Sequence, residues 1–161
     1  MRSERCKAGE KVRQVVIIAV SDDEYAIPIE HVREITRIEK VQHVPDAADY
    51  VAGLINLRGQ AIPLVSLHVR FGLQNNTEKI MIKNAYALIT EYYGVQVALL
   101  VDEVREVRSV PHLEEVPPLI NTPYVKGVIN LSGRLIMEID IKEMLRDSGI
   151  EELTDNAREE K

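Results

Sequence analysis

The side chains that could catalyse a reaction or hold a metal ion are few and widely spaced. The histidines are His31, His43, His68 and His112, and the one cysteine is Cys6. No two histidines have the HxxxH or HExxH spacing that places two imidazoles on one helix face. We therefore interpret each histidine as a surface or edge residue, and we predict no metal site and no disulfide.

Paired carboxylates could share acid and base roles in catalysis. Asp22-Asp23 and Glu114-Glu115 lie beside turn-forming residues, which favours solvated charge. In Asp102-Glu103, one side chain would face inward and the other outward if the segment is a strand. The GxSxG, P-loop and GxGxxG patterns are missing as well. The sequence therefore predicts no catalytic residue and no cofactor, and it indicates a protein that is not an enzyme.

Arg58 has the side chain best suited to binding a partner. It lies in Asn56-Leu57-Arg58-Gly59, which recurs as Asn130-Leu131-Ser132-Gly133. Since the second copy has Ser132 at this position, the turn does not need an arginine in order to fold. Two interpretations remain open: a solvated arginine at the tip of a turn, or a planar donor fork for a partner's carboxylate or carbonyl group.

A second recurring segment carries charge on a predicted strand. Val32-Arg33-Glu34-Ile35 returns as Val104-Arg105-Glu106-Val107. Strand alternation would place Val32 with Glu34 on one face and Arg33 with Ile35 on the other. Such a mixed patch suits the rim of an interface, although an ordinary strand surface would look the same.

Both segments belong to a repeat that spans most of the chain. Tyr50–Leu67 and Tyr124–Ile141 share eight of eighteen aligned residues, at an offset of 74 positions. Ala26–Ile35 parallels Ala98–Val107 at an offset of 72. Each unit has about 60 residues, too few to bury much surface alone, so the two units are expected to pack together.

Composition and charge argue against several classes of protein. The net charge is −6, and no basic stripe is present that would bind nucleic acid. The longest apolar run is Val15–Val20, far short of the ~20 residues of a membrane helix. The first residues also lack the apolar stretch of a signal peptide. We therefore expect a cytoplasmic protein that neither binds nucleic acid nor inserts directly into a membrane.

The local signals are mostly those of short strands. Val, Ile and Leu dominate the apolar residues, turn signals recur about every ten residues, and residues 108 to 123 look like a long irregular connection. Ser66 and Asp140 are helix N-cap types that would each start a short helix, and Gly72 would end the first of them. These signals predict an all-β fold of two small barrels packed together, with short helices after the repeat strands and near the C-terminus.

At these residues the chain resembles the CheW family of bacterial chemotaxis adaptor proteins. The resemblance rests on EYAIPIEHVREI, on YVAGLINLRGQAIPLVSLHVRFG and on YVKGVINLSGRLIMEIDIKEML. It implies two five-stranded, SH3-like barrels with a shared apolar core. The implied organisation is a flexible arm (1–13), a CheW-like domain (14–146) and a charged tail (147–161). Within the domain the repeat units cover about 14–73 and 84–146, and strands are free to exchange between barrels.

The resemblance also implies partners and binding residues. The family joins the regulatory domain of the histidine kinase CheA to the cytoplasmic tips of methyl-accepting chemoreceptors, in arrays at the inner face of the membrane. The residues that match its receptor-binding region are Arg58, Glu34, Asn56, Gly53 and Val104. Ile29 and Val32, on the expected second strand of the first repeat, match the apolar contact with the kinase.

Two alternatives to a chemotaxis adaptor remain from the sequence alone. The same type of adaptor could serve another receptor-kinase pathway, such as surface motility or gene regulation. A small-ligand-binding or catalytic barrel is the alternative from a different class, and it would need a buried polar cluster in an enclosed pocket.

Overall fold

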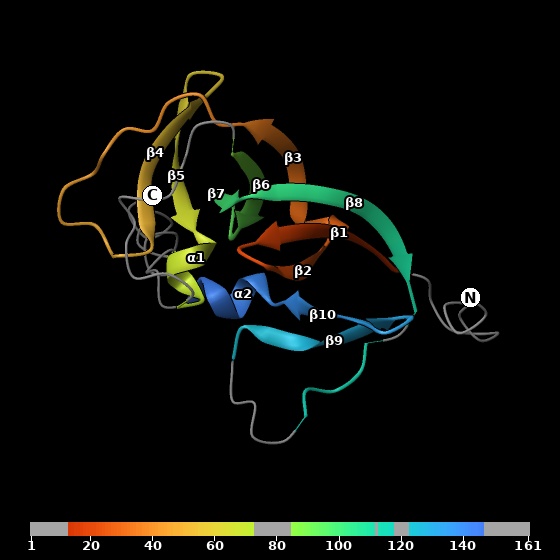
Figure 1. Ribbon diagram of the computed structural model, residues 1–161. Helices are drawn as coiled ribbons and strands as arrows, with labels where there is room; N and C mark the ends of the chain where they lie inside the picture. The colour runs from red at the N-terminus through yellow and green to blue at the C-terminus, as the bar shows by residue number, and fades with distance from the viewer. Residues whose placement is uncertain (1–12, 73–84, 112, 118–122, 147–161) are drawn as a thin grey trace.

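The computed structural model describes residues 13–72, 85–111, 113–117 and 123–146. Cys6, His112, the charged tail and the predicted arm, apart from Arg13, lie outside these residues. Within them, strands form two five-stranded sheets with short helices between (Figure 1). The predicted all-β class is therefore confirmed, and each sheet makes a small barrel of the SH3-like type.

The first sheet, called the β1 barrel here, has the strand order β8-β1-β2-β10-β9. Its strands are β1 (Arg13–Val20), β2 (Asp23–Pro28), β8 (Glu103–Val110), β9 (Val125–Leu131) and β10 (Arg134–Ile139). Neighbours pair antiparallel except β2 and β10, which run parallel. Because β8 extends to Val110, the irregular connection predicted for residues 108 to 123 begins later than expected.

The second sheet, the β3 barrel, has the order β3-β6-β7-β5-β4. Its strands are β3 (Val32–Arg37), β4 (Val51–Leu57), β5 (Gln60–Ser66), β6 (Tyr86–Tyr92) and β7 (Val95–Val101). Here β5 and β7 are the parallel pair. Each barrel therefore combines two consecutive strands of one repeat with three strands of the other.

Two four-residue helices lie where the repeat strands end. Helix α1 (Leu67–Arg70) starts at Ser66, whose hydroxyl accepts a hydrogen bond from Val69 N at 3.4 Å. Helix α2 (Ile141–Met144) starts at Asp140, whose carboxylate accepts from Glu143 N at 3.2 Å. Both predicted N-caps are confirmed, because each side chain satisfies a free N–H group of the first turn.

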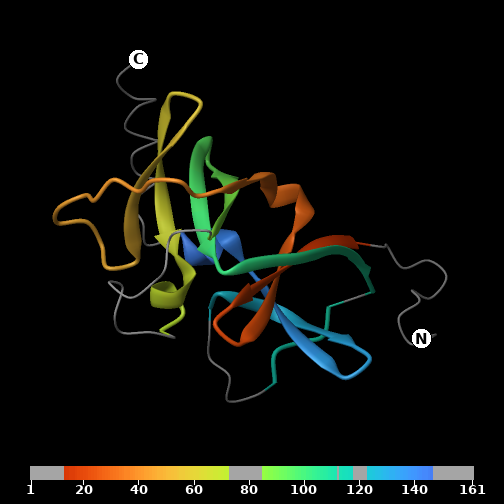
Figure 2. The same ribbon diagram turned by 45° about the horizontal axis from the view of Figure 1, so that its top comes forward.

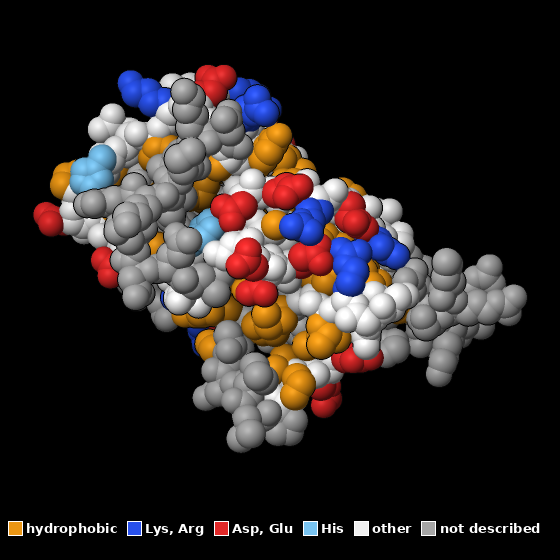
Figure 3. Space-filling model, in the orientation of Figure 1, with side chains coloured by type: hydrophobic (Ala, Val, Ile, Leu, Met, Phe, Trp, Pro, Cys, Tyr) orange, Lys and Arg blue, Asp and Glu red, His pale blue; other side chains and the backbone are white. Residues whose placement is uncertain are grey.

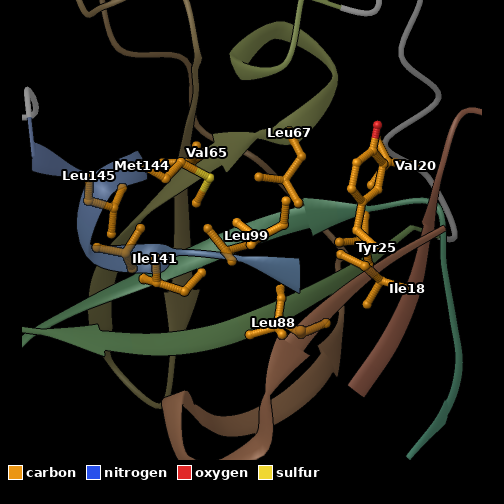
Figure 4. Close-up of a cluster of buried hydrophobic side chains, with 14 of the residues drawn as sticks. Ile18, Val20, Tyr25, Val65, Leu67, Leu88, Leu99, Ile141, Met144 and Leu145 are labelled. Atoms are coloured by element: carbon orange, nitrogen blue, oxygen red, sulfur yellow. The ribbon is translucent and has the colours of Figure 1, made fainter. Parts of the chain in front are cut away.

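The largest apolar core lies between the barrels (Figure 4). It takes Ile18 and Tyr25 from the β1 barrel, Leu88 and Leu99 from the β3 barrel, and residues of both helices. Separate clusters fill the interior of each barrel. Since the barrels share their main core, neither buries its apolar surface alone.

Arg70 closes this junction on the helix side. Its guanidinium donates to the carbonyl oxygen of Met144, its counterpart in the other repeat, at 2.8 and 3.1 Å. It also lies 4.9 Å from the ring centroid of Tyr50 and 4.3 Å from that of Tyr124. These two tyrosines occupy equivalent places in the repeat, so one cation contacts both copies.

Candidate functional site

The candidate binding surface is centred on an ion pair across the β3 barrel. Arg58 Nη2 lies 2.8 Å from Glu34 Oε1 and 2.7 Å from Oε2. Glu34 is on β3 and Arg58 follows β4, and these strands are the two edges of the sheet. The pair therefore spans the seam where the sheet curls back on itself.

Arg58 remains largely free to meet another molecule. Its side chain is 72% exposed, and Glu34 is 29% exposed. Among the described residues, only Nη2 of the guanidinium forms a contact, which leaves the N–H groups of Nε and Nη1 as donors. Glu34 thus orients the arginine without occupying all of its donors.

The turn below Arg58 has a geometry that does not depend on the arginine. Arg58 and Gly59 have φ angles of 50° and 85°, and Ser132 and Gly133 have 51° and 93°. Such a pair of positive φ angles matches a type I′ hairpin turn, which places glycine second. Asn56 Oδ1 accepts from Gly59 N at 2.9 Å. Asn56 therefore stabilises the turn through its side chain.

Gly53 lies where another segment crosses β4 closely. A Cβ atom at Gly53 would be 2.4 Å from the carbonyl oxygen of Gln42 and 2.5 Å from a methyl carbon of Val41. Gln42 and Leu54 form an isolated β-bridge at this crossing. A Cβ atom at Gly127, the repeat counterpart of Gly53, would come equally close to Leu113 and Glu114. Gly53 therefore lets the chain cross β4, which is a structural role shared by both copies.

The VREI segment alternates as expected. Val32 and Glu34 are half-buried, whereas Arg33 and Ile35 are exposed, with Ile35 at 41%. Val32 and its counterpart Val104 both pack against the core between the barrels. Val104 lies on β8 of the β1 barrel, so the structure does not place it on the same sheet as Arg58.

The residues expected to meet the kinase lie elsewhere than predicted. Ile29 belongs to a 3-10 turn, η2 (Ile29–His31), and Val32 begins β3, so neither is on the second strand. Pro28 ends β2 and turns the chain from one barrel to the other. Ile29 is 38% exposed beside an open hollow of about 450 Å³. The hollow is lined by Arg13, Gln14, Pro28, Ile29, Glu30 and Ser109.

His68 is the polar residue whose environment the sequence did not reveal. We expected a surface or edge histidine, but its side chain is only 4% exposed. Its Nε2 lies 3.0 Å from Asp102 Oδ2, and the same oxygen accepts from Ser21 N at 2.7 Å. These contacts join α1, the bend between β7 and β8, and the β1–β2 turn. Asp102 and Glu103 are both exposed, and Asp102 lies in the bend before β8, so the pair is not the strand segment for which one inward side chain was expected.

The β1 barrel carries its ion pairs at other places. Figure 3 shows acidic and basic side chains gathered over β8 and its neighbours. Glu24 lies 2.8 Å from Arg134 and 3.6 Å from Arg105. Glu106, the counterpart of Glu34, is 3.3 Å from Arg108 rather than from the turn at Ser132. The two barrels therefore present different surfaces on a similar framework.

Three further properties of the described residues concern membranes, metal ions and titration. No helix among them is long and apolar enough to cross a membrane. Within the same ranges, no three His, Cys, Asp or Glu side chains gather as a metal site would require. Burial raises the pKa of the Tyr25 hydroxyl, and the nearby charge of Asp23 raises it further.

Comparison with known proteins gives a consistent result. The family model described as "CheW-like domain" matches residues 14–149. The chemotaxis protein CheW of Helicobacter pylori is 28% identical over 142 residues, covering 86% of this chain and 84% of that protein. Its namesake in Bacillus subtilis is also 28% identical, over 144 residues that cover 86% of this chain and 88% of that one.

A solved structure also has the same fold. The crystal structure of the scaffolding protein TtCheW from Thermoanaerobacter tengcongensis matches with a TM-score of 0.76 at 26% sequence identity. The match covers 86% of this chain and 96% of that one. Since the family model spans nearly every described residue of both barrels, the chain belongs to the family of CheW-like domain proteins.

Proposed function

We propose that this protein is a noncatalytic adaptor of bacterial chemotaxis, which links chemoreceptor cytoplasmic tips to the histidine kinase CheA. The observation that carries the proposal is the CheW-like match over residues 14–149. An adaptor of this kind works in the cytoplasm, at receptor arrays on the inner face of the membrane, and transfers no chemical group itself.

The receptor would bind at the surface around Arg58. Its partner would be a helical hairpin that offers carboxylates or carbonyl groups to the exposed guanidinium. Glu34 would hold Arg58 in place, and Asn56 and Gly53 would fix the turn and the strand beneath it. Val104, at the rim of the core between the barrels, would add an apolar contact.

The kinase would bind at the link between the barrels. Ile29 is exposed there, and Val32 follows it at the edge of the shared core. The regulatory domain of the kinase would insert an apolar side chain beside Ile29. With two partners on different surfaces, the adaptor would change kinase activity by bridging and by stabilising one kinase state over another.

Binding assays with purified components test the proposal. The full chain is titrated with a receptor cytoplasmic fragment and, separately, with the CheA regulatory domain. Arg58→Ala is expected to weaken receptor binding roughly tenfold to a hundredfold, because a charge-assisted hydrogen bond contributes about 1.5–3 kcal/mol. Kinase binding and thermal stability should stay unchanged, since an exposed ion pair contributes at most about 1 kcal/mol.

The matched control is Arg146→Ala. Arg146 is 68% exposed and forms a similar surface pair with Glu143 at 3.4 Å, after α2. The Arg146→Ala variant should bind the receptor fragment and the kinase domain as tightly as the unmodified chain does. Equal loss in both variants would assign the effect to net charge, and normal receptor binding by Arg58→Ala would remove Arg58 from the site. If the unmodified chain binds neither partner, the adaptor function is wrong.

A further inference from the structure

The two barrels differ at the place where their parallel strands begin. In the β3 barrel, β5 and β7 pair only along Leu64–Ser66 and Ala98–Leu100. Nearer their hairpin turns, which lie at the same end of the barrel (Figure 2), the strands separate. An open gap of about 590 Å³ lies between them, lined by Gln60, Ala61, Ile62, Pro63, Glu91, Gly94, Val95 and Gln96.

Pro63 explains why the ladder stops. Leu57 and Gln60 close a two-residue turn as a hydrogen-bonded pair, so alternate residues from Gln60 onward bond to β4. Ala61 and Pro63 therefore direct their peptide groups towards β7, where proline has no N–H to donate. Met137 holds the equivalent position in the β1 barrel, and it does pair with Tyr25 of β2.

An ion pair holds the equivalent strands together in the β1 barrel. Arg134 donates from Nη2 and Nε to the two carboxylate oxygens of Glu24, at 2.8 and 3.2 Å. The repeat counterparts of these residues are Gln60 and Gln96. Both are uncharged amides, so this end of the gap lacks the bidentate contact that joins β10 to β2.

The gap presents the groups that recognise a peptide backbone. By the same alternation, Val95 and Val97 bond to β6, so Gln96 directs its N–H and C=O towards β5. On β5, Ala61 directs its N–H and C=O groups into the gap towards β7. We propose that an extended segment of a partner protein adds here as a strand, bonding to Ala61 or Gln96 through its main chain.

The lining also specifies what this segment is like. Glu91 is the one charged residue among the described lining residues, and Arg33 neutralises it at 2.8 Å. A nearly neutral lining offers no ion pair to a charged side chain that leaves water, so we expect an uncharged segment. The separated part of β5 runs from Gln60 to Pro63, which fits about four residues at ~3.3 Å per residue. This surface is distinct from Arg58 and Ile29, and it does not depend on the proposed adaptor function.

Peptide selection tests this proposal without knowledge of the partner. Linear heptapeptides displayed on phage are selected on the full chain and counter-selected on Gln60→Arg/Gln96→Glu, which reproduces the Arg134–Glu24 pair. We expect peptides poor in charged residues that bind the double variant at least about tenfold more weakly. Each single variant lacks the new ion pair and should keep most of the binding.

A proline substitution and amide exchange give independent measurements. Ala61→Pro removes the N–H that faces the gap and leaves the bonds to β4, and Pro63 shows that this strand accepts proline in that orientation. Ala61→Pro should therefore weaken the binding of the selected peptides, whereas Ala61→Val should not. In the unmodified chain, bound peptide should slow hydrogen exchange at Ala61 or Gln96. The proposal fails if no peptide survives counter-selection, or if the unmodified chain and the Gln60→Arg/Gln96→Glu variant bind the peptides equally. It also fails if the amides protected by bound peptide are not those of Ala61 or Gln96.

Discussion

At the scale of single residues, burial decides what each arginine–glutamate pair contributes. In Arg58–Glu34 the arginine is exposed and the glutamate half-buried, so the pair contributes little stability and the guanidinium can bind other groups. Arg13–Glu138 is the opposite case, because the Glu138 side chain is fully buried and Arg13 Nη1 contacts both carboxylate oxygens, at 2.8 and 3.1 Å. Arg13 Nη2 is also buried and has no hydrogen-bond partner among the described residues, which offsets part of the gain.

This difference predicts the effect of removing Arg13. Arg13→Met should lower the free energy of unfolding by about 2–3 kcal/mol, because Glu138 would be left as an unpaired buried charge. Replacing both residues, with Arg13→Met/Glu138→Leu, should restore most of the loss. Urea unfolding of the three proteins measures this directly. A double variant as unstable as the single one would mean that packing around Arg13, and not its charge, stabilises this site.

Tyr25 gives a prediction about alkaline pH. Burial and Asp23 raise its pKa in the folded chain above the unfolded value of about 10. The folded state then holds the proton more tightly, so this contribution is fully present below pH ~10 and is lost as pH rises through the folded pKa. The unfolding free energy of the unmodified chain should fall more steeply above pH ~10 than that of Tyr25→Phe. Parallel slopes for the two proteins would contradict this assignment.

Residue types predicted the ion-pair surface better than they predicted the buried polar groups. The comparison of Arg58 with Ser132 identified an arginine that the turn does not need, and the structure places it beside Glu34. His68 carried no such signal, since a histidine two residues after the helix N-cap Ser66 is ordinary in sequence. Its burial follows from the approach of Asp102 and Ser21, which are distant in the chain.

At the scale of elements, local chemistry could be predicted and pairing could not. Helix N-caps and strand alternation depend on neighbours within a few residues, and these predictions held at Ser66, Asp140 and Val32. The 3-10 turn at Ile29 was missed because IPIEHV keeps a strand-like composition through the point where the chain changes barrel. Strand partners follow from tertiary packing, which composition does not encode.

Two glycines of the same β4–β5 hairpin should respond differently to an added methyl group. Gly53→Ala would place a Cβ within 2.5 Å of backbone and side-chain atoms of residues 41–42, whereas Gly59→Ala meets nothing within 4 Å. Both have positive φ, at 151° and 85°. Gly59→Ala should therefore cost only about 1 kcal/mol from backbone strain. Gly53→Ala should add a further cost of roughly 1–3 kcal/mol for the close contact.

Thermal and urea unfolding of the two variants measure this difference. Because the Gln42–Leu54 bridge crosses at Gly53, amide exchange of Leu54 should also become faster in Gly53→Ala alone. Equal destabilisation by both substitutions would mean that the 41–42 segment yields easily, and that Gly53 is not needed for the crossing.

At the scale of the whole molecule, the repeat and the barrel are different units. Strands β1 and β2 come from the first repeat but belong to a sheet completed by β8, β9 and β10 of the second. The reverse exchange builds the β3 barrel, in which β6 and β7 complete β3, β4 and β5. Two similar repeats in sequence could equally make two self-contained barrels, so the repeat pattern alone does not choose between these arrangements.

The exchange makes a prediction about a chain cut between its repeats. Fragments 1–76 and 77–161 each lack strands of both barrels, so each alone should show little cooperative unfolding. Mixed in equal amounts, they should restore cooperative unfolding, because each supplies the missing strands and its half of the core between the barrels. Circular dichroism melting of the fragments, separately and together, measures this. If one fragment alone melts cooperatively, its strands must pair within one repeat in isolation, and the exchange would then be a preference of the intact chain rather than a requirement for folding.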